Sequence, residues 1–174
     1  MKLELQAVLI QRYPCYFRKP GMRFVEVESV SNTEGLVQDG GPFDDWGVEC
    51  GDGWFSLVDR LSRECENEIE RLQSLGVAKE RWPRVAQIKE KFGSLRFYTR
   101  GSLPEELRER ILKISEEESR CTCELCGAPR KPGPREAWRP TTCGDCADKS
   151  AQQAVAQDKH LHAQLLALLA SRAG

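Results

Sequence analysis

The chain has 174 residues, of which 40% are hydrophobic and 30% charged, a composition typical of a globular protein rather than a disordered one. It contains no run of about 18 apolar residues and no recognisable secretory leader, so we expect no membrane span and a cytoplasmic location. The net charge of −1 is uneven: residues 1–80 hold 9 Lys and Arg against 15 Asp and Glu, and residues 81–174 hold 17 against 12. A basic half of this kind can meet an acidic partner, but ordinary surface solvation explains it as well.

The first fifty residues contain one clear strand pattern. Residues 23–28 alternate apolar and polar side chains with the two-residue period of a half-buried strand. Residues 31–53 are rich in Gly, Asp and Asn, which predicts turns. We expect the aromatic segment 12–17 to pack in the core.

A long amphipathic helix is predicted from Trp54 onward. Asp52 is a suitable N-cap, because its carboxylate can accept hydrogen bonds from amides of the first turn. Gly76 is a suitable C-terminal stop. Apolar residues three or four positions apart form one buried stripe: Trp54, Leu57, Val58, Leu61, Cys65, Ile69, Leu72 and Leu75.

A β-hairpin is predicted over residues 84–89 and 95–99, with Gly93 supplying the unusual backbone angle of the turn. Its apolar face would carry Ala86, Ile88, Leu95 and Phe97. Its polar face holds the candidate binding residues, which are Lys89, Arg96, Tyr98 and Arg100, with Lys91 in the turn. Cations beside an aromatic ring can hold phosphate and stack a base, or they can dock a protein. A solvated strand face explains the same pattern equally well.

Two further helices are predicted toward the C-terminus. Ser102 is a suitable cap for the first, with Pro104 in its opening turn, and this helix should end near Ser119. Residues 127–140 are rich in proline and predict a loop, with a short hairpin around Trp138. The final helix is predicted from about Asp145 through Leu161, Leu165, Leu168 and Leu169. It either packs on its own domain, which we favour, or pairs with a second copy as a homodimer.

The strongest chemical signal is a set of four cysteines, Cys123-x2-Cys126-x16-Cys143-x2-Cys146. This spacing is typical of structural zinc, because each pair can turn tightly and aim two thiolates at one ion. Four thiolates at about 2.3 Å close a tetrahedron around Zn²⁺ and leave no open position. A following helix would make the module treble-clef-like rather than a pure ribbon. The alternatives are reduced structural cysteines and disulfides, and we expect Cys121 to be a bystander.

Three sequence blocks carry a resemblance to a known family. They are residues 46–55 (WGVECGDGWF), residues 87–98 (QIKEKFGSLRFY) and residues 122–129 (TCELCGAP), followed by Trp138 and Cys143. As a set they resemble a family of small, largely uncharacterised proteins of phages, prophages and bacteria. The family usually has Gly after the last Pro, where this chain has Arg130. The resemblance implies an accessory role on a mobile genetic element and carries no assigned activity.

Together the patterns predict an α+β fold with a helix–β-hairpin–helix core in residues 1–120. Residues 121–174 would form the zinc module and the C-terminal helix. We expect a non-catalytic zinc-stabilised protein that binds a host or phage protein, as an inhibitor of a bacterial defence system would. The alternative partner is nucleic acid.

A metal-dependent nuclease is the least favoured function. The segment Gln87-Ile88-Lys89 is similar to the acidic-x-Lys element of such enzymes, but Gln87 stands where a carboxylate is needed. The remaining candidate metal ligands are Glu49, Asp52 and Asp59. We expect Asp52 to serve as a cap and Asp59 to be a solvated helix residue.

Overall fold

The structure, a computed structural model, describes residues 1–17, 43, 46–132, 141–153, 156–157, 160 and 164. The predicted strand at 23–28, the hairpin around Trp138 and the leucines of the C-terminal helix lie outside these residues. Among the described residues, no helix combines the length and the apolar character that crossing a membrane requires.

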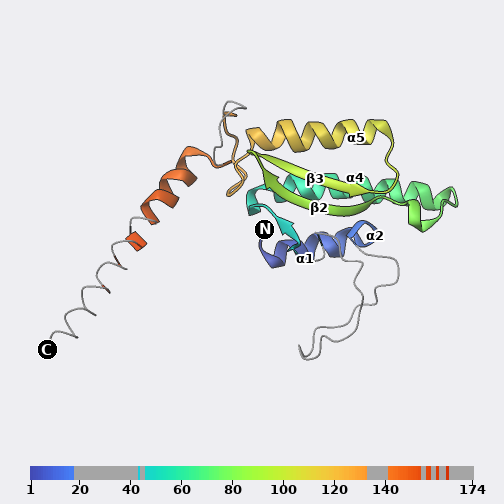
Figure 1. Ribbon diagram of the computed structural model, residues 1–174, viewed down its shortest axis with the longest axis horizontal. Helices are drawn as coiled ribbons and strands as arrows, with labels where there is room; N and C mark the ends of the chain where they lie inside the picture. Colours follow the sequence, from blue (N-terminus) through green and yellow to red (C-terminus); the bar gives the residue numbers. More distant parts are fainter. Residues whose placement is uncertain are drawn as a thin grey trace.

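The chain has the predicted α+β class, with helices packed around a small sheet (Figure 1). Helix α4 lies behind the sheet, α1 and α2 lie along one side of it, and α5 lies along the other. The helices of the described residues include α1 (Leu3–Arg12), α2 (Pro14–Phe17), α4 (Phe55–Ser74) and α5 (Glu105–Leu112), with a further helical segment at 144–153. The strands are β1 (Val48–Glu49), β2 (Arg84–Lys91) and β3 (Ser94–Arg100). Short turns of 3₁₀ helix are η1 (Asp52–Trp54), η2 (Lys79–Arg81) and η4 (Ser119–Cys121), and η3 (Lys113–Glu118) is a π-helix.

The three strands pair in the order β1-β2-β3, with β1 parallel and β3 antiparallel to β2. The predicted hairpin is therefore confirmed. Ile88 lies opposite Phe97 and Lys89 lies opposite Arg96, so the apolar and polar faces separate as the alternation predicts. A bulge between Val85 and Gln87 interrupts this register, which the sequence pattern did not indicate.

Helix α4 supplies the centre of the core. Its predicted stripe is buried from Trp54 to Leu72, but Leu75 is 63% exposed because the helix ends at Ser74. Gly76 stops the helix as predicted, with a φ of +67° that a glycine adopts without strain. The chain then turns back, and the amide of Val77 donates to the carbonyl of Leu72 over 3.0 Å.

Both predicted side-chain caps are wrong. Asp52 opens the 3₁₀ turn η1 instead, and its carboxylate accepts the amide of Lys2 at 2.8 Å. Helix α5 begins after Pro104 without a side-chain cap, so Ser102 does not cap it. Asp52 therefore has another partner in the folded chain, and Ser102 is not placed to cap its helix.

The helices at the N-terminus were not predicted, although the expected burial of their aromatic residues is confirmed. Tyr16 is fully buried and stacks on Phe97 with ring centroids 5.7 Å apart. The carboxylate of Glu66 on α4 accepts the amides of Cys15 at 3.0 Å and Tyr16 at 2.8 Å. Glu66 thereby satisfies two amides at the start of α2 that no turn of that helix could pair.

Candidate metal centre and hairpin face

The four predicted cysteine ligands come together in one cluster. The sulfur atoms of Cys123, Cys126, Cys143 and Cys146 all lie within 4.8 Å of one another. The sulfurs of Cys126 and Cys143 are 3.7 Å apart, and a tetrahedron with metal–sulfur bonds of about 2.3 Å has edges of about 3.8 Å. A disulfide would need about 2.05 Å, and the cysteines are free thiols. The cluster therefore has the dimensions of a metal site, and Cys121 lies outside it.

The metal knuckle, defined here as residues 122–128 together with 141–146, is built from tight backbone turns. The amide of Cys123 donates to the carbonyl of Ala128 over 2.8 Å, and the amide of Gly127 donates to the carbonyl of Cys123 over 2.9 Å. Gly127 has a φ of +76°, which a glycine after the first cysteine pair permits.

The second cysteine pair lies at the start of a helix. The helical segment begins at residue 144, so Cys143 precedes it and Cys146 lies in its first turn. The amide of Ala147 donates to the carbonyl of Cys143 over 3.0 Å. This is the position that a treble-clef-like module requires, and the assignment to that class stays a prediction.

The thiols of the cluster differ in acidity. Burial raises the pKa of the Cys123 thiol. Its sulfur also accepts hydrogen bonds from the backbone amides of Cys126, Cys143 and Leu125. These bonds outweigh the effect of burial and lower the pKa to about 6. Hydrogen bonds to the sulfurs of Cys126 and Cys143 raise the pKa of the Cys146 thiol to about 12. Four thiolates this close need a cation to balance their charge, so metal binding must displace protons from the cluster.

The glycine-rich block at 51–54 packs directly on the metal knuckle. The amide of Gly53 donates to the carbonyl of Glu124 over 2.7 Å, and the amide of Gly51 donates to the Glu124 carboxylate over 2.8 Å. The indole of Trp54 donates to the carbonyl of Thr122 over 3.0 Å. Residues 46–55 and 122–129, two of the three blocks that carry the family resemblance, therefore pack against each other. Glu124 is a residue that the sequence analysis missed.

The approach of the two segments leaves no room for a side chain. A Cβ atom on Gly53 would lie 2.3 Å from both the carbonyl oxygen of Cys123 and the amide nitrogen of Gly127. One on Gly51 would lie 2.3 Å from the carbonyl oxygen of Glu124. The glycines of this block are thus explained by close backbone packing rather than by a turn.

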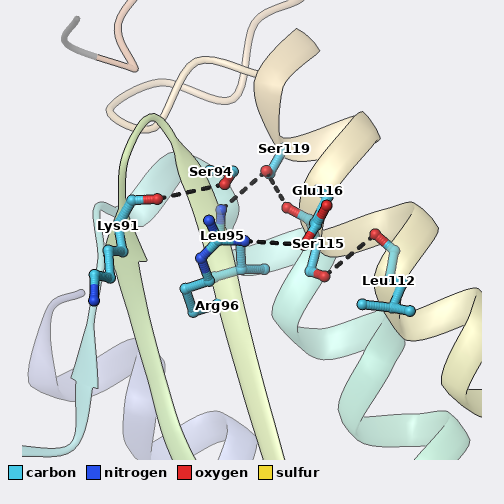
Figure 2. Close-up of polar contacts among 8 residues, drawn as sticks. All are labelled: Lys91, Ser94, Leu95, Arg96, Leu112, Ser115, Glu116 and Ser119. Carbon is cyan, nitrogen blue, oxygen red and sulfur yellow. Dashed lines mark hydrogen bonds and ion pairs between the residues drawn. The ribbon is translucent and has the colours of Figure 1, made fainter. Parts of the chain in front are cut away.

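The five predicted binding residues lie on the hairpin but are not equally free. Lys89 and Arg96 are register partners, and Tyr98 is 46% exposed beside them, while Lys91 and Arg100 are exposed. The Arg96 side chain is only 23% exposed, and its guanidinium forms an ion pair with Glu116 of η3 at 3.1 Å (Figure 2). Glu49 shares the polar face, since it pairs in register with Lys89.

The π-helix η3 holds strand β3 in place. Figure 2 shows the amide of Leu95 donating to the hydroxyl of Ser119 just beyond η3, over 3.0 Å. That hydroxyl in turn donates to the carbonyl of Ser115. Serine hydroxyls that bond back to the preceding turn compete with regular helical hydrogen bonds, and they often bend a helix.

The carboxylates considered for a nuclease do not gather around one point. Asp59 accepts hydrogen bonds from Arg12 at 2.8 Å and Tyr13 at 3.0 Å, and Asp52 pairs with Lys2. Glu49 lies on the sheet, where its carboxylate accepts the Gln87 amide at 3.1 Å. Within the described part of the chain, the four cysteines are the one group with metal-site geometry.

Comparison of the chain with family models, with curated proteins and with solved structures gives no match. The function must therefore be argued from the site and the hairpin face themselves.

Proposed function

We propose that this protein is a non-catalytic binding protein whose fold is completed by a structural zinc ion and whose partner is another protein. The observation that carries the proposal is the closed four-cysteine cluster and its contact with residues 51–54. Four sulfur ligands select zinc among the abundant divalent ions and leave no position for a substrate or a reactive water. Such an ion orders a surface instead of performing chemistry.

The charge distribution favours a protein partner over nucleic acid. The chain has a net charge of −1 and a pI of about 6.2, whereas a nucleic-acid-binding domain is typically strongly basic. The cations on the polar face of the hairpin have two acidic neighbours, Glu49 on β1 and Glu116 on η3. Both carboxylates would repel phosphates. Aromatic residues and Arg are instead enriched at protein interfaces, and the rims of such interfaces are polar.

The resemblance to proteins of phages and prophages supports a host protein as that partner, and inhibition of a host defence system is the role we propose for it. The test is affinity capture from a nuclease-treated host lysate, followed by mass spectrometry. We expect the wild-type protein to retain one host protein that Lys89→Glu releases, while a Cys126→Ser variant should lose zinc but keep the partner, because the hairpin does not depend on the four sulfurs. Equal recovery by wild type and Lys89→Glu, or recovery that vanishes on nuclease treatment, would contradict the proposal.

Nucleic acid remains a second candidate because the exposed ring of Tyr98 lies beside Lys89 and Arg96, as in a stacking platform. If it is the partner, fluorescence anisotropy will detect DNA or RNA binding that weakens steeply with salt. Lys89→Ala and Arg96→Ala would each reduce it. No binding at low salt would exclude this function.

A further inference from the structure

The turn of the β-hairpin has an unusual composition. Phe92 has a φ of +55° and Gly93 a φ of +78°, so both central residues are left-handed, as in a type I′ turn. The first of these positions normally carries Asn, Asp or Gly, and a bulky side chain there costs about 1–2 kcal/mol. Phe92 is 66% exposed, so burial in the core does not offset this strain.

The turn is nevertheless firmly held. The carboxylate of Glu90 accepts the amide of Gly93 at 2.8 Å, and the hydroxyl of Ser94 donates to the carbonyl of Lys91 over 3.4 Å. The next residue, Leu95, is fixed to Ser119, as Figure 2 shows. An exposed aromatic ring is thus presented on a rigid support and in a strained conformation that nothing within the described fold requires.

Two lysines accompany the ring. The ammonium of Lys91 lies 5.1 Å from the centroid of the Phe92 ring, within the range of a cation–π contact. Lys89 lies two residues before Lys91 on strand β2 and belongs to the polar face of the hairpin. Among the described residues, neither lysine has a carboxylate within ion-pair distance, unlike Arg96. These two charges are available to a partner.

We propose that the hairpin tip, defined as Lys89, Lys91 and Phe92, binds an acidic segment of a partner protein. Carboxylates of that segment pair with the two lysines, and an apolar side chain packs on the Phe92 ring. The inference rests on the proposed function and specifies its partner's chemistry. Single-stranded nucleic acid fits this surface less well, because it would need successive aromatic rings along a basic groove. The charge of Arg96, which lies between Phe92 and Tyr98 in the sequence, is instead paired with Glu116.

The charge requirement is tested with a short fluorescein-labelled peptide of alternating Glu and Leu, a matched peptide with Gln for Glu, and oligothymidylate. Fluorescence anisotropy at low salt should show that the wild-type protein binds the Glu peptide more tightly than the other two probes. Lys91→Glu should weaken that binding by about tenfold or more. The control Lys149→Glu makes the same charge change on an exposed residue of the segment 144–153 and should leave binding near wild type. An equal effect of both substitutions, or tighter binding of oligothymidylate, would overturn the inference.

The strain gives a second and independent test, because one substitution should move stability and binding in opposite directions. Phe92→Asn places a residue that tolerates left-handed angles in the turn, so the thermal midpoint should rise while binding of the Glu peptide falls. A lower midpoint, or unchanged peptide binding, would contradict the inference. If Phe92→Asn still captures the host partner that Lys89→Glu releases, the partner docks on the polar face of the hairpin without the Phe92 ring, so the inference fails and the proposed function stands. If wild type captures no partner, the proposed function fails, whatever the peptide shows.

Discussion

Gly53 determines how closely the metal knuckle can approach the body of the protein. A methyl group at this position would meet backbone atoms of Cys123 and Gly127, neither of which can rotate away. We expect Gly53→Ala to lower the free energy of unfolding by about 1–3 kcal/mol, as overpacking does. Zinc affinity should fall as well, because the knuckle must shift. Urea denaturation and competition with a chromophoric chelator measure the two effects.

Gly144 provides the matched control, since it belongs to the same knuckle but a Cβ there meets nothing within 4 Å. Gly144→Ala should leave zinc affinity and stability at or slightly above wild type, because alanine favours the helix that begins there. If the two alanine variants lose the same stability, close packing at Gly53 is not the reason for its glycine.

For single residues, the sequence predicts local chemistry well and contacts between distant residues poorly. The four clustered cysteines could be named because the two residues within each pair fix their geometry locally. Glu124 could not, because its carboxylate meets the amide of Gly51 across 73 residues of chain. The glycines at 51 and 53 indicated turns when only their neighbours were considered, and their actual role depends on the knuckle.

Helical and strand periodicities predicted the two most regular parts of the fold, α4 and the hairpin, because burial on one face requires them. Helix α2 was missed because it is only four residues long and depends on Glu66 of another helix. The cap predictions failed for a similar reason, since Asp52 has a stronger partner in Lys2. The contact between the Ser119 hydroxyl and the Leu95 amide joins two elements that are distant in sequence, so local patterns did not indicate it.

The link between η3 and the sheet makes Ser119 more important than its small side chain suggests. Ser119 is fully buried, and its hydroxyl accepts the Leu95 amide. We expect Ser119→Ala to lower the free energy of unfolding by about 1–3 kcal/mol, because a buried amide loses its partner. Hydrogen exchange at Leu95 should accelerate, which amide-resolved NMR would measure.

Ser74→Ala is the control for this loss, because the Ser74 hydroxyl also donates to a helix carbonyl, that of Arg71 at 2.7 Å, but lies exposed. Its effect should stay within about 0.5 kcal/mol. Unchanged exchange at Leu95 in Ser119→Ala would show that the strand is held by other contacts, such as the ion pair between Arg96 and Glu116.

For the molecule as a whole, the metal knuckle and the sheet are stabilised in different ways. The sheet and α4 share an apolar core that includes Leu61, Ile88 and Phe97. Within the knuckle, Cys123 is the one ligand that is fully buried, and Cys126 is exposed. We expect a module with so little apolar burial to depend on a bound ion, because in small zinc modules the ion contributes roughly 10–16 kcal/mol.

Removal of the metal should therefore release one part of the protein and leave the other folded. We expect hydrogen exchange measured by mass spectrometry to increase strongly at residues 50–55 and 122–128 when a chelator is added. The first segment responds because Gly51, Gly53 and Trp54 donate to the knuckle. Residues 84–100 should change little, since their strand pairing and apolar core do not involve the sulfurs. A uniform increase across the chain would mean that the sheet cannot fold without the ion.

The metal itself is identified by elemental analysis of the purified protein, which should give one zinc per chain. Cys146→Ser should lose that zinc and reproduce the exchange pattern of the chelated wild type, whereas Cys121→Ser should retain it because Cys121 lies outside the cluster. Metal loss in both variants would place Cys121 among the ligands. A metal-free wild type with unchanged exchange on chelation would instead mean that contacts between residues 51–54 and Glu124 order the knuckle without an ion.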